Sequence, residues 1–487
     1  MATSSPFLYK TFARRETHPA RLGALARLQG IESAPAAACS VFEIGCGDGG
    51  NLIPLAAQYP KSRFVGIDPE EALIEKGRQE IQELGLSNLQ LESGDITSYG
   101  VDEKSFDYVV CHGVFSWVSE DVQSAIMAKS AGALSPDGVF FVSYNTFPGW
   151  RQRGAVRDIL LTGARRARSD DPQERYTHAL SFLNMIANTR VGGEDPFAMY
   201  IREANQRLQT SEPSYVLQEF LGRYNTPLLF QEFMRVAHGN SLQFLSESRV
   251  VMMSADDLQP ALREYVDSIQ DDIIGREQVL DIFRNRTFRE TLLCRAERSL
   301  QRGLKVDAFK SLTMVTNYIP VGSGAGHDGR MHFQERTTGR ELQTPPGECS
   351  DVLALLASRG PKGCVFADLF DCSRGVLSLS EKDLLVAAVT LWRSGFIDLL
   401  TEPLTGVERP EGRVKVGAWT KVQCDRSSKV TSALHDSYPL SPVEKRALAL
   451  AQGEMTFTAL TVQLLQETPE QEVRALLASL WERGFFI

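Results

Sequence analysis

Four glycines within the segment 43–50 form the pattern in this sequence that most directly suggests chemistry. Gly45, Gly47, Gly49 and Gly50 would let the backbone turn sharply and approach a ligand at points where a Cβ would clash. The segment follows a short apolar strand and precedes a helix, whose first N–H groups have no partners inside the helix. The pattern therefore predicts a loop that holds a nucleotide-like cofactor.

An acidic residue two positions before the first glycine narrows the kind of cofactor. A dinucleotide site holds its pyrophosphate over G-x-G-x-x-G, whereas the spacing here is G-x-G-x-G-G and Glu43 precedes it. A carboxylate at that position would repel a pyrophosphate, but it suits a ligand that carries an amino group and a sulfonium. The expected cofactor contacts in this loop are Glu43, Gly45, Cys46 and Gly47.

Two further acids follow the next two predicted strands. Asp68 could accept both hydroxyls of a ribose, and Asp95 could accept from an adenine amino group. Pro69 and Ile96 lie beside them, with Ile96 placed to pack against the adenine ring. Each acid alone would equally fit a solvated loop or a helix cap. Because the carboxyl ends of parallel strands meet at one edge of a sheet, the joint placement of Glu43, Asp68 and Asp95 predicts a site for S-adenosylmethionine.

The loops after the fourth and fifth predicted strands are where a methyl acceptor would arrive. The candidate residues there are His112, Trp117, Tyr144, Asn145 and Trp150. Aromatic faces attract a cation such as an alkyl-ammonium group, although aromatic side chains as often pack in a core. We expect His112 to orient a ligand rather than to act as a general base. Methyl transfer from a sulfonium is an in-line displacement, so positioning supplies most of the acceleration.

The residues after the fourth predicted strand argue against two kinds of acceptor. Methyltransferases that act on the amino groups of DNA bases or of glutamine carry a loop like N-P-P-Y there. This sequence has Cys-His-Gly-Val-Phe at 111–115. Nucleic-acid bases and glutamine therefore lose support as acceptors.

Strands and helices alternate from residue 39 to about 145, as a parallel sheet requires. The predicted strands are 40–44, 63–67, 89–92, 106–110 and 138–144, and the predicted helices are 51–58, 70–84 and 122–134. The pattern predicts an α/β chain that begins with a Rossmann-like sheet of the class I methyltransferase type. Residues 152–300 have mostly helical periodicity, with a short strand expected at 244–247.

The last third of the chain contains a faint internal repeat. The segment 391–397, Leu-Trp-Arg-Ser-Gly-Phe-Ile, resembles 480–487, Leu-Trp-Glu-Arg-Gly-Phe-Phe-Ile, and 365–369 resembles 456–460. Helices followed by a glycine turn and an apolar strand are the outline of a winged helix. We therefore predict two winged-helix-like modules in this region.

Composition and charge exclude several classes of function. Hydrophobic residues make up 43% and charged residues 23% of the sequence, which is ordinary for a globular protein. No apolar run approaches the roughly 20 residues of a membrane helix and the first residues lack a secretory pattern, so we expect a cytoplasmic protein without membrane insertion. The net charge of −9 gives no case for nucleic acid and better suits a small molecule or a protein partner that bears lysines. The eight cysteines have no zinc-ligand spacing, so no metal site is predicted.

Several longer strings resemble one known group of enzymes across nearly the whole chain. They are 17–22 (THPARL), 42–54 (FEIGCGDGGNLIP), 111–118 (CHGVFSWV), 143–150 (SYNTFPGW), 227–233, 242–247 and 281–294. These strings look like bacterial methyltransferases that carry a methyltransferase regulatory domain. The best-known members of that group are the rickettsial protein lysine methyltransferases, which modify outer-membrane proteins. The resemblance implies cofactor contacts at Glu43, Gly45, Gly47, Asp68, Asp95 and His112, and an acceptor pocket that includes Trp117, Tyr144, Asn145 and Trp150.

Two segments depart from the pattern of that family. The histidine that is usual before Glu232 is Gln231 here, and a Pro-Tyr-Pro-Ser-like stretch near the N-terminus is Phe7-Leu-Tyr-Lys10. If either segment closes over the acceptor, substrate specificity differs from that of the rickettsial enzymes.

With 487 residues the chain is too long for a single core, and we expect several domains. They are an N-terminal lead-in or lid, a methyltransferase domain, a helical insert with the regulatory domain, a linker marked by Gly322–Gly326, and two winged-helix-like modules. Their expected bounds, in that order, are 1–36, 37–165, 166–310, 311–345, 346–405 and 406–487.

Four functions are compatible with the sequence. The first is methylation of lysine side chains in a protein, such as an outer-membrane or surface protein. The second is methylation of a small molecule or peptide, and the third is non-catalytic binding of S-adenosylmethionine by a regulatory protein. Winged helices also suggest nucleic-acid binding, but residues 440–487 carry more acidic than basic side chains. The helices expected at 152–220 could mediate a homodimer or serve as a lid.

Overall fold

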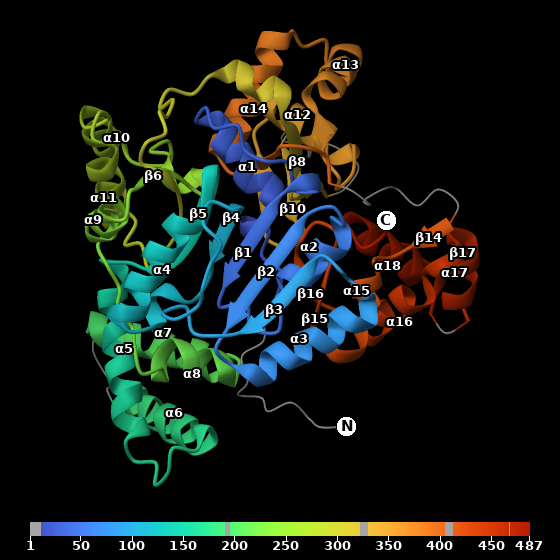
Figure 1. Cartoon of the computed structure of the whole chain (residues 1–487). Helices are drawn as coiled ribbons and strands as arrows, with labels where there is room; N and C mark the ends of the chain where they lie inside the picture. The colour runs from blue at the N-terminus through green and yellow to red at the C-terminus, as the bar shows by residue number, and fades with distance from the viewer. Residues whose placement is uncertain (1–10, 190–194, 322–329, 405–412, 467) are drawn as a thin grey trace.

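The structure is a computed structural model that describes residues 11–189, 195–321, 330–404, 413–466 and 468–487. Within these residues the chain forms a central mixed sheet, helices on both faces of the sheet, and smaller units at its borders (Figure 1). The segments Phe7–Lys10 and Gly322–Gly326, which the sequence singled out, lie outside the described residues.

The central sheet has seven strands in the order β3-β2-β1-β4-β5-β7-β6. Along the chain they are β1 (Ser40–Ile44), β2 (Arg63–Asp68), β3 (Leu89–Ser93), β4 (Phe106–Cys111), β5 (Leu134–Asn145), β6 (Leu242–Glu247) and β7 (Phe288–Arg295). The first five strands pair in parallel, and β7 runs antiparallel between β5 and β6. The predicted α/β fold with a Rossmann-like parallel sheet is thus confirmed, and two more strands extend it.

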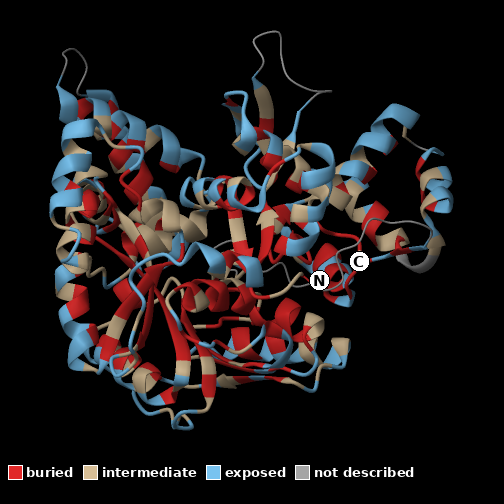
Figure 2. Ribbon diagram, turned by 90° about the horizontal axis from the view of Figure 1, so that it is seen from above, coloured by how far each residue is buried: buried red, intermediate tan, exposed pale blue. Residues whose placement is uncertain are grey.

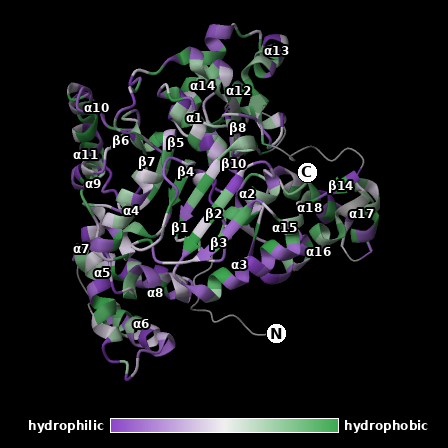
Figure 3. Cartoon of the chain, viewed as in Figure 1, coloured by the Kyte–Doolittle hydropathy of each residue, from purple (hydrophilic) through white to green (hydrophobic). Residues whose placement is uncertain are grey.

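Successive side chains along the strands point to two separate cores, as the period of a strand requires. Tyr108 and Val110 of β4 join the core that contains the N-terminal helix, whereas Val109 and Cys111 join the core on the opposite face. Figure 2 shows the strands as buried, with exposed residues on the outer sides of the surrounding helices, and Figure 3 shows the hydrophilic outer side of helix α3 (Glu71–Leu84). Burial on both faces explains why the strands read as short apolar runs.

The helices that cover the sheet within the first 165 residues begin with α1, which packs on the same face as Tyr108. They are α1 (Pro19–Leu28), α2 (Leu52–Gln58), α3 (Glu71–Leu84), α4 (Glu120–Ala133) and α5 (Gly149–Ala164). The His18 side chain caps α1, since its Nδ1 accepts from the Ala20 backbone N–H at 3.2 Å. These helices lie within two residues of the bounds that the sequence predicted for 51–58, 70–84 and 122–134.

The helical insert lies beyond β5 and projects from the sheet at α6 (Figure 1). Its helices are α6 (Pro172–Thr189), α7 (Pro196–Gln209), α8 (Pro213–Leu221), α9 (Phe230–Gly239), α10 (Pro260–Ser268) and α11 (Ile273–Phe283). The helices α5 to α8 share a core of their own, with Leu160, Leu183 and Phe220 fully buried.

The described residues of 152–300 are mostly helical, as predicted, but strand β7 was not expected there. Its apolar residues Leu292, Leu293 and Cys294 are consecutive and all buried. A continuous apolar run can be a buried strand or a piece of buried helix, and periodicity alone does not separate the two. The short strand expected at 244–247 is present as β6.

The described residues of the segment 311–345, which was predicted to be a linker, instead form strands that are part of the packed structure. They are β8 (Thr313–Thr316), β9 (Tyr318–Pro320), β10 (Met331–Glu335) and β11 (Glu341–Thr344). Met314 and Phe333 are fully buried and join the core of the following module. Their strands are short and rich in polar residues, so only isolated apolar positions signalled the packing.

The two C-terminal modules repeat one local feature that the sequence predicted. The first contains α12 (Glu348–Ser358), β12 (Cys364–Val365), α13 (Phe366–Val376), α14 (Glu381–Arg393) and β13 (Ile397–Leu400), and the second contains β14 (Arg413–Lys415), α15 (Ala418–Arg426), β15 (Lys429–Thr431), β16 (Ser437–Pro439), α16 (Pro442–Leu450), β17 (Gln452–Thr456), α17 (Phe457–Leu464) and α18 (Glu470–Glu482). Two residues beyond the end of α14 and of α18 lies a glycine with positive φ, 76° at Gly395 and 77° at Gly484. The next residue's N–H then donates back to a leucine carbonyl, at 2.8 Å for Phe396 and 3.0 Å for Phe485. The assignment of these modules as winged helices stays a prediction.

The described residues lack a membrane-spanning helix and a cluster of metal ligands. None of the helices found there is both long and apolar enough to cross a membrane. In the same part of the chain, no group of three or more His, Cys, Asp or Glu side chains could hold a metal ion.

Candidate active site

The glycine loop connects β1 to α2 at the carboxyl edge of the sheet. Gly45, Gly47 and Gly49 have φ values of 75°, 56° and 78°, in the left-handed region that favours glycine. A Cβ at Gly45 would lie 2.3 Å from Val114, and a Cβ at Gly47 would lie 2.4 Å from Thr11. The glycines are therefore required both for the backbone turn and for the close approach of two other segments.

Glu43 is buried beneath this loop and is only half satisfied. Its exposed fraction is 5%, and its Oε1 accepts from the Asn51 amide at 3.0 Å. Its Oε2 has no hydrogen-bond partner among the described residues. Burial raises the pKa of Glu43 to about 8, although the Asn51 hydrogen bond acts in the opposite direction. A buried carboxyl with one unpartnered oxygen is suited to a cationic or hydrogen-donating ligand.

Asp68 and Asp95 lie at the ends of the next two strands outward from β1. The Asp68 carboxylate accepts from the backbone N–H groups of Gly47 and Glu70, each at 2.9 Å, and burial raises its pKa. Asp95 is exposed and accepts from the backbone and the hydroxyl of Thr97, each at 2.8 Å. These two bonds lower the pKa of Asp95. Pairing of β2 with β3 aligns Asp68 with Ser93, so the acids step outward along one edge.

The neighbouring residues Pro69 and Ile96 differ in exposure. Pro69 is exposed, whereas Ile96 is 5% exposed and joins the core on the α4 face of the sheet. Cys46 is buried, and burial raises the pKa of its thiol well above the ordinary value. Its Sγ lies within 3.7 Å of the Gly47 carbonyl, so this thiol packs beneath the loop.

The segment that precedes α1 crosses the glycine loop, a feature that the sequence did not predict in detail. The Gly50 N–H donates to the Thr11 hydroxyl at 2.9 Å. The Arg14 N–H donates to Asn51 Oδ1 at 3.0 Å. The described part of the N-terminal lead-in is thus held at the loop by hydrogen bonds between backbone N–H groups and side-chain oxygens.

His112 follows β4 and faces the side of the sheet that carries α1. Its ring lies 6.1 Å from that of Phe141 and 6.2 Å from that of Phe288, measured between centroids. Burial, aided by the nearby Arg14 charge, lowers the pKa of His112 to about 3, so the imidazole is neutral at physiological pH. Its Nδ1 has no partner within the described chain. A neutral ring with a free nitrogen fits the predicted role of orienting a ligand.

The other acceptor-side residues that the sequence singled out lie close together but are more buried than expected. Trp117 is half-buried and meets Trp150 edge to face, with ring centroids 5.8 Å apart. Trp150 is 1% exposed, and its Nε1 has no partner among the residues described. The Asn145 amide donates to Asn225 at 3.1 Å, and its backbone N–H donates to the Ser116 hydroxyl at 2.8 Å.

Tyr144 points to the opposite side of the sheet from His112. It is 1% exposed, stacks on Phe233 at 3.9 Å between centroids, and has its hydroxyl 3.1 Å from Thr291 Oγ1. This position favours a packing role over direct contact with an acceptor. The strand alternation that separates Tyr144 from Ser143 was visible in the sequence and would have signalled the difference.

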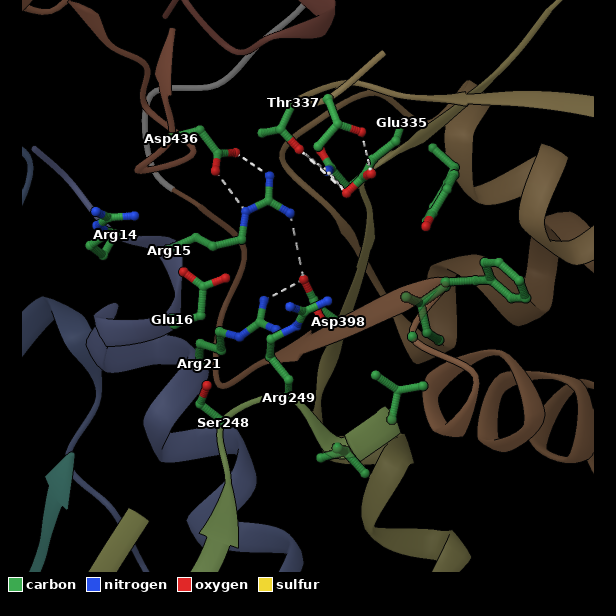
Figure 4. Close-up of a pocket in the computed structure, with 18 of the residues that line it drawn as sticks. Arg14, Arg15, Glu16, Arg21, Ser248, Arg249, Glu335, Thr337, Asp398 and Asp436 are labelled. Carbon is green, nitrogen blue, oxygen red and sulfur yellow. Dashed lines mark hydrogen bonds and ion pairs between the residues drawn. The ribbon is translucent and has the colours of Figure 1, made fainter. Parts of the chain in front are cut away.

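A polar cleft of about 560 Å³ opens at the same edge of the sheet, beyond β6 (Figure 4). Arg14 lines this cleft and also donates its backbone N–H to Asn51, so the cleft adjoins the glycine loop. Ser248 lies in its wall, and the Ser248 hydroxyl is 3.4 Å from Glu290 Oε2. Burial is the main cause that raises the pKa of Glu290 to about 7, and the negative charge of the nearby Glu16 raises it further.

Glu290 is the residue of this region that sequence reasoning missed. It pairs across the sheet with Ser143, whose hydroxyl accepts from the Gly113 N–H at 2.8 Å next to His112. The string Phe-Arg-Glu-Thr-Leu-Leu-Cys was noted as a motif, but its strand conformation was not predicted. Because β7 was not predicted, no feature of the sequence placed Glu290 at the carboxyl edge of the parallel strands.

Comparisons with known proteins agree with this geometry. Residues 41–138 match the family model described as a methyltransferase domain, and residues 212–295 match that described as a predicted methyltransferase regulatory domain. The chain is 33% identical to protein RP028 of Rickettsia prowazekii over 238 residues, which cover 49% of this chain and 94% of that protein. It is 30% identical to protein RP789 of the same organism over 312 residues, which cover 64% of this chain. The match spans only 56% of the length of that relative.

The fold also matches a solved structure over almost its full length. The structure of PKMT2 from Rickettsia typhi covers 98% of this chain and 100% of its own, with a TM-score of 0.86 and 23% sequence identity. The same protein in complex with AdoHcy matches with a TM-score of 0.85. The two C-terminal modules and the strands at 311–345 therefore belong to one architecture that is shared with that protein.

Proposed function

Since this chain belongs to the class I methyltransferases that carry a methyltransferase regulatory domain, we propose that it methylates lysine side chains of a protein. S-adenosylmethionine is the methyl donor of this domain. The observation that carries the proposed acceptor is the 560 Å³ cleft, which adjoins the glycine loop and is lined mainly by polar and charged side chains. A cleft of this size is within the range of ligand sites, and its opening suits a side chain delivered by a polypeptide.

The residues at the strand ends fit the cofactor. Glu43 Oε2 is an unpartnered buried acceptor for an amino group, and each Asp68 oxygen retains a lone pair for a ribose hydroxyl. Asp95 remains exposed, where it can accept from an adenine amino group. When bound, the cofactor supplies an electrophilic methyl group on a sulfonium.

The protein has to supply orientation and a route for a proton. A lysine amine accepts a methyl group only when its lone pair is free, so the ammonium must first lose a proton. Glu290 borders the cleft wall through Ser248, and its pKa of about 7 lets it take up a proton near neutral pH. We assign to Glu290 this proton-accepting role and to His112 the orientation of the acceptor. The neutral His112 ring adds no positive charge that would repel a lysine.

The direct test follows labelled methyl groups from S-adenosylmethionine into proteins. The full chain is incubated with the labelled cofactor and a lysine-rich protein extract, and the products are separated by mass and identified by mass spectrometry. Methylated lysines in proteins support the proposal. Label found only in compounds of low mass would favour a small-molecule acceptor, and binding without transfer would favour a regulatory protein that holds the cofactor.

A matched pair of variants tests the role of Glu290. Glu290→Gln keeps the shape of the side chain but cannot take up a proton, so we expect kcat to fall by about 10²-fold with unchanged cofactor affinity. Glu335→Gln is the control, because Glu335 lines the same cleft but already accepts from Asn317 at 3.3 Å. Equal activity of both variants would remove Glu290 from the mechanism.

A further inference from the structure

The hairpin formed by β15 and β16 brings a buried histidine to the cofactor site from the far end of the chain. The turn between the strands spans Ser432–Asp436, and it is closed by hydrogen bonds from Ser432 N–H to Asp436 O at 2.8 Å and from His435 N–H to Ser432 O at 3.0 Å. The Ala433 N–H donates to Gly484 O at 2.9 Å, which fixes the turn to the end of α18. The position of His435 is therefore set by the backbone of the second C-terminal module.

An ion pair holds this turn against the N-terminal segment. The Arg15 guanidinium meets the Asp436 carboxylate, with Nε 2.6 Å from Oδ1 (Figure 4). Asp436 directly follows His435, and Arg15 directly follows Arg14, whose N–H is bound to Asn51. Arg15 and Asp436 are separated by 421 positions in the sequence. Their ion pair thus brings two distant segments together beside the glycine loop.

His435 itself contacts the residue that holds Glu43. Its side chain is fully buried, and its Nε2 lies 2.8 Å from Asn51 Oδ1. Asn51 in turn donates from its amide nitrogen to Glu43 Oε1 at 3.0 Å. A continuous chain of hydrogen bonds therefore runs from the C-terminal module to the carboxyl group beneath the glycine loop.

The direction of every bond in this chain can be derived. The Arg14 backbone N–H can only donate, so the Asn51 atom that faces it must be the amide oxygen. The amide nitrogen then faces Glu43 and donates to it. Because the same amide oxygen faces His435, the proton of the neutral ring must lie on Nε2. Burial lowers the pKa of His435 well below its ordinary value, which agrees with a neutral donor.

We propose that His435 is a positioning residue of the cofactor site, which orients Asn51 and thereby Glu43 so that the free Glu43 oxygen meets the amino group of the cofactor. The inference rests on the proposed cofactor contact of Glu43. It means that the methyltransferase domain alone has an incomplete site, and that the second C-terminal module supplies the missing donor. His435 Nδ1 has no partner among the described residues, so the ring is held there by its Nε2 bond and by packing against His18.

Two substitutions separate the hydrogen bond from the packing. His435→Leu keeps the volume but removes the donor, whereas His435→Gln keeps an amide N–H near the place of Nε2. We expect His435→Leu to weaken binding of S-adenosylhomocysteine by on the order of tenfold and His435→Gln to restore most of that affinity. The measurement is titration calorimetry on the full-length chain, with a thermal melt to confirm that each variant is folded.

The pH dependence gives a readout that a purely structural residue would not change. The Asn51 hydrogen bond lowers the pKa of Glu43, so releasing Asn51 should move the midpoint of cofactor affinity to higher pH in His435→Leu. In an Asn51→Ala background, His435→Leu should have no additional effect on affinity. If His435→Leu fails to fold, His435→Asn, with a side chain too short to reach Asn51, takes its place in both measurements.

Three outcomes would overturn the inference. Unchanged affinity in His435→Leu, or additive effects with Asn51→Ala, would show that His435 does not act through Asn51. Those results would leave the proposed function intact, because the unaltered chain still binds the ligand and transfers methyl groups. Failure of the unaltered chain to bind S-adenosylhomocysteine would overturn both proposals together.

Discussion

Two buried glutamates, Glu43 and Glu247, lie near the same edge of the central sheet and differ in how many of their oxygens have partners. Beneath the glycine loop, Glu43 has one oxygen without a partner among the described residues. At the end of β6, Glu247 accepts from Arg289 at 2.6 Å and from the Thr291 hydroxyl at 2.8 Å, and it also pairs with Arg286. Both glutamates are buried, at 5% and 0% exposure.

The difference in partners reverses the direction of the pKa shift. Burial raises the pKa of Glu43 to about 8. Burial also acts to raise the pKa of Glu247, but the Arg286 and Arg289 charges and the Thr291 bond outweigh it and hold that pKa below its ordinary value. A buried acid with its charge compensated stabilises the fold, whereas a buried acid left partly open is available for a ligand. The comparison thus separates a structural charge cluster from a binding site.

The largest expected effect comes from breaking the compensated cluster. Arg289 contacts Glu247, Glu277 and Asp281 and stacks over Phe230, with no exposed surface. Arg289→Met would leave these acids without their shared partner, so we expect the free energy of unfolding to fall by about 3–5 kcal/mol. Urea unfolding measures the loss. Arg249→Met, at an exposed arginine of the cleft, is the control and should change stability by less than about 0.5 kcal/mol.

The next largest effect is expected at the proposed cofactor site, where the acids can still accept hydrogen bonds from a ligand. Asp68→Ala removes two predicted contacts to ribose hydroxyls and also frees the Gly47 N–H. We expect cofactor affinity to fall by on the order of 10²-fold, with a much smaller loss of stability than for Arg289→Met. Titration calorimetry with S-adenosylhomocysteine measures the change, and Asp68→Asn serves as the variant that keeps one acceptor oxygen, which can still accept from the Gly47 N–H. An unchanged affinity in Asp68→Ala would place the ribose elsewhere.

The raised pKa of Glu43 predicts how cofactor affinity depends on pH. Below its pKa of about 8 the side chain carries a proton, and a cationic group of the ligand favours the ionised form, so binding releases that proton. Affinity should therefore rise by up to about tenfold per pH unit between pH 6 and 8 and level off above. For the free protein the sign is opposite, because a folded-state pKa above the unfolded value makes stability fall as pH rises toward 8.

Glu43→Gln distinguishes this titration from any other. The amide keeps the hydrogen bond with Asn51 but does not ionise, so the rise of affinity with pH should disappear. Calorimetry in two buffers of different ionisation enthalpy would also detect the released proton. A slope that persists in Glu43→Gln would assign the proton to another group.

The contrast also explains which parts of the site the sequence could predict. The glycine loop and the acids at 43, 68 and 95 lie at or just past the carboxyl ends of β1, β2 and β3. Buried apolar residues located these strands, as a continuous run in β1 and β2 and in alternation with polar residues in β3, and the parallel topology brought their ends to one edge. The cluster around Arg289 could not be predicted, because its members come from β6, β7 and α11. Charged residues on three distant elements carry no local signal that they will be buried together.

The same limit applies to His435, whereas for Tyr144 the sequence did carry a signal, the alternation of side chains along the strand. The contact of His435 with Asn51 spans 384 positions and depends on how the second module docks. Tyr144 directly follows Ser143 on β5, and the period of the strand turns the two side chains to opposite faces. Sequence proximity to the active edge therefore placed Tyr144 on the acceptor side, whereas the packing of β5 against α9 places its ring in the core.

Tyr144→Phe gives the smallest expected effect and decides to which group this residue belongs. The Thr291 hydroxyl donates to Glu247, so the Tyr144 hydroxyl must donate to Thr291, and the phenol forms the end of the compensated network. Removal of this one bond should lower the free energy of unfolding by about 1 kcal/mol, while the stack on Phe233 is retained. Turnover and cofactor affinity should then stay within about twofold of the unaltered chain. A tenfold loss of kcat with unchanged stability would instead return Tyr144 to the acceptor side, and the boundary between the structural cluster and the binding site would have to move to include it.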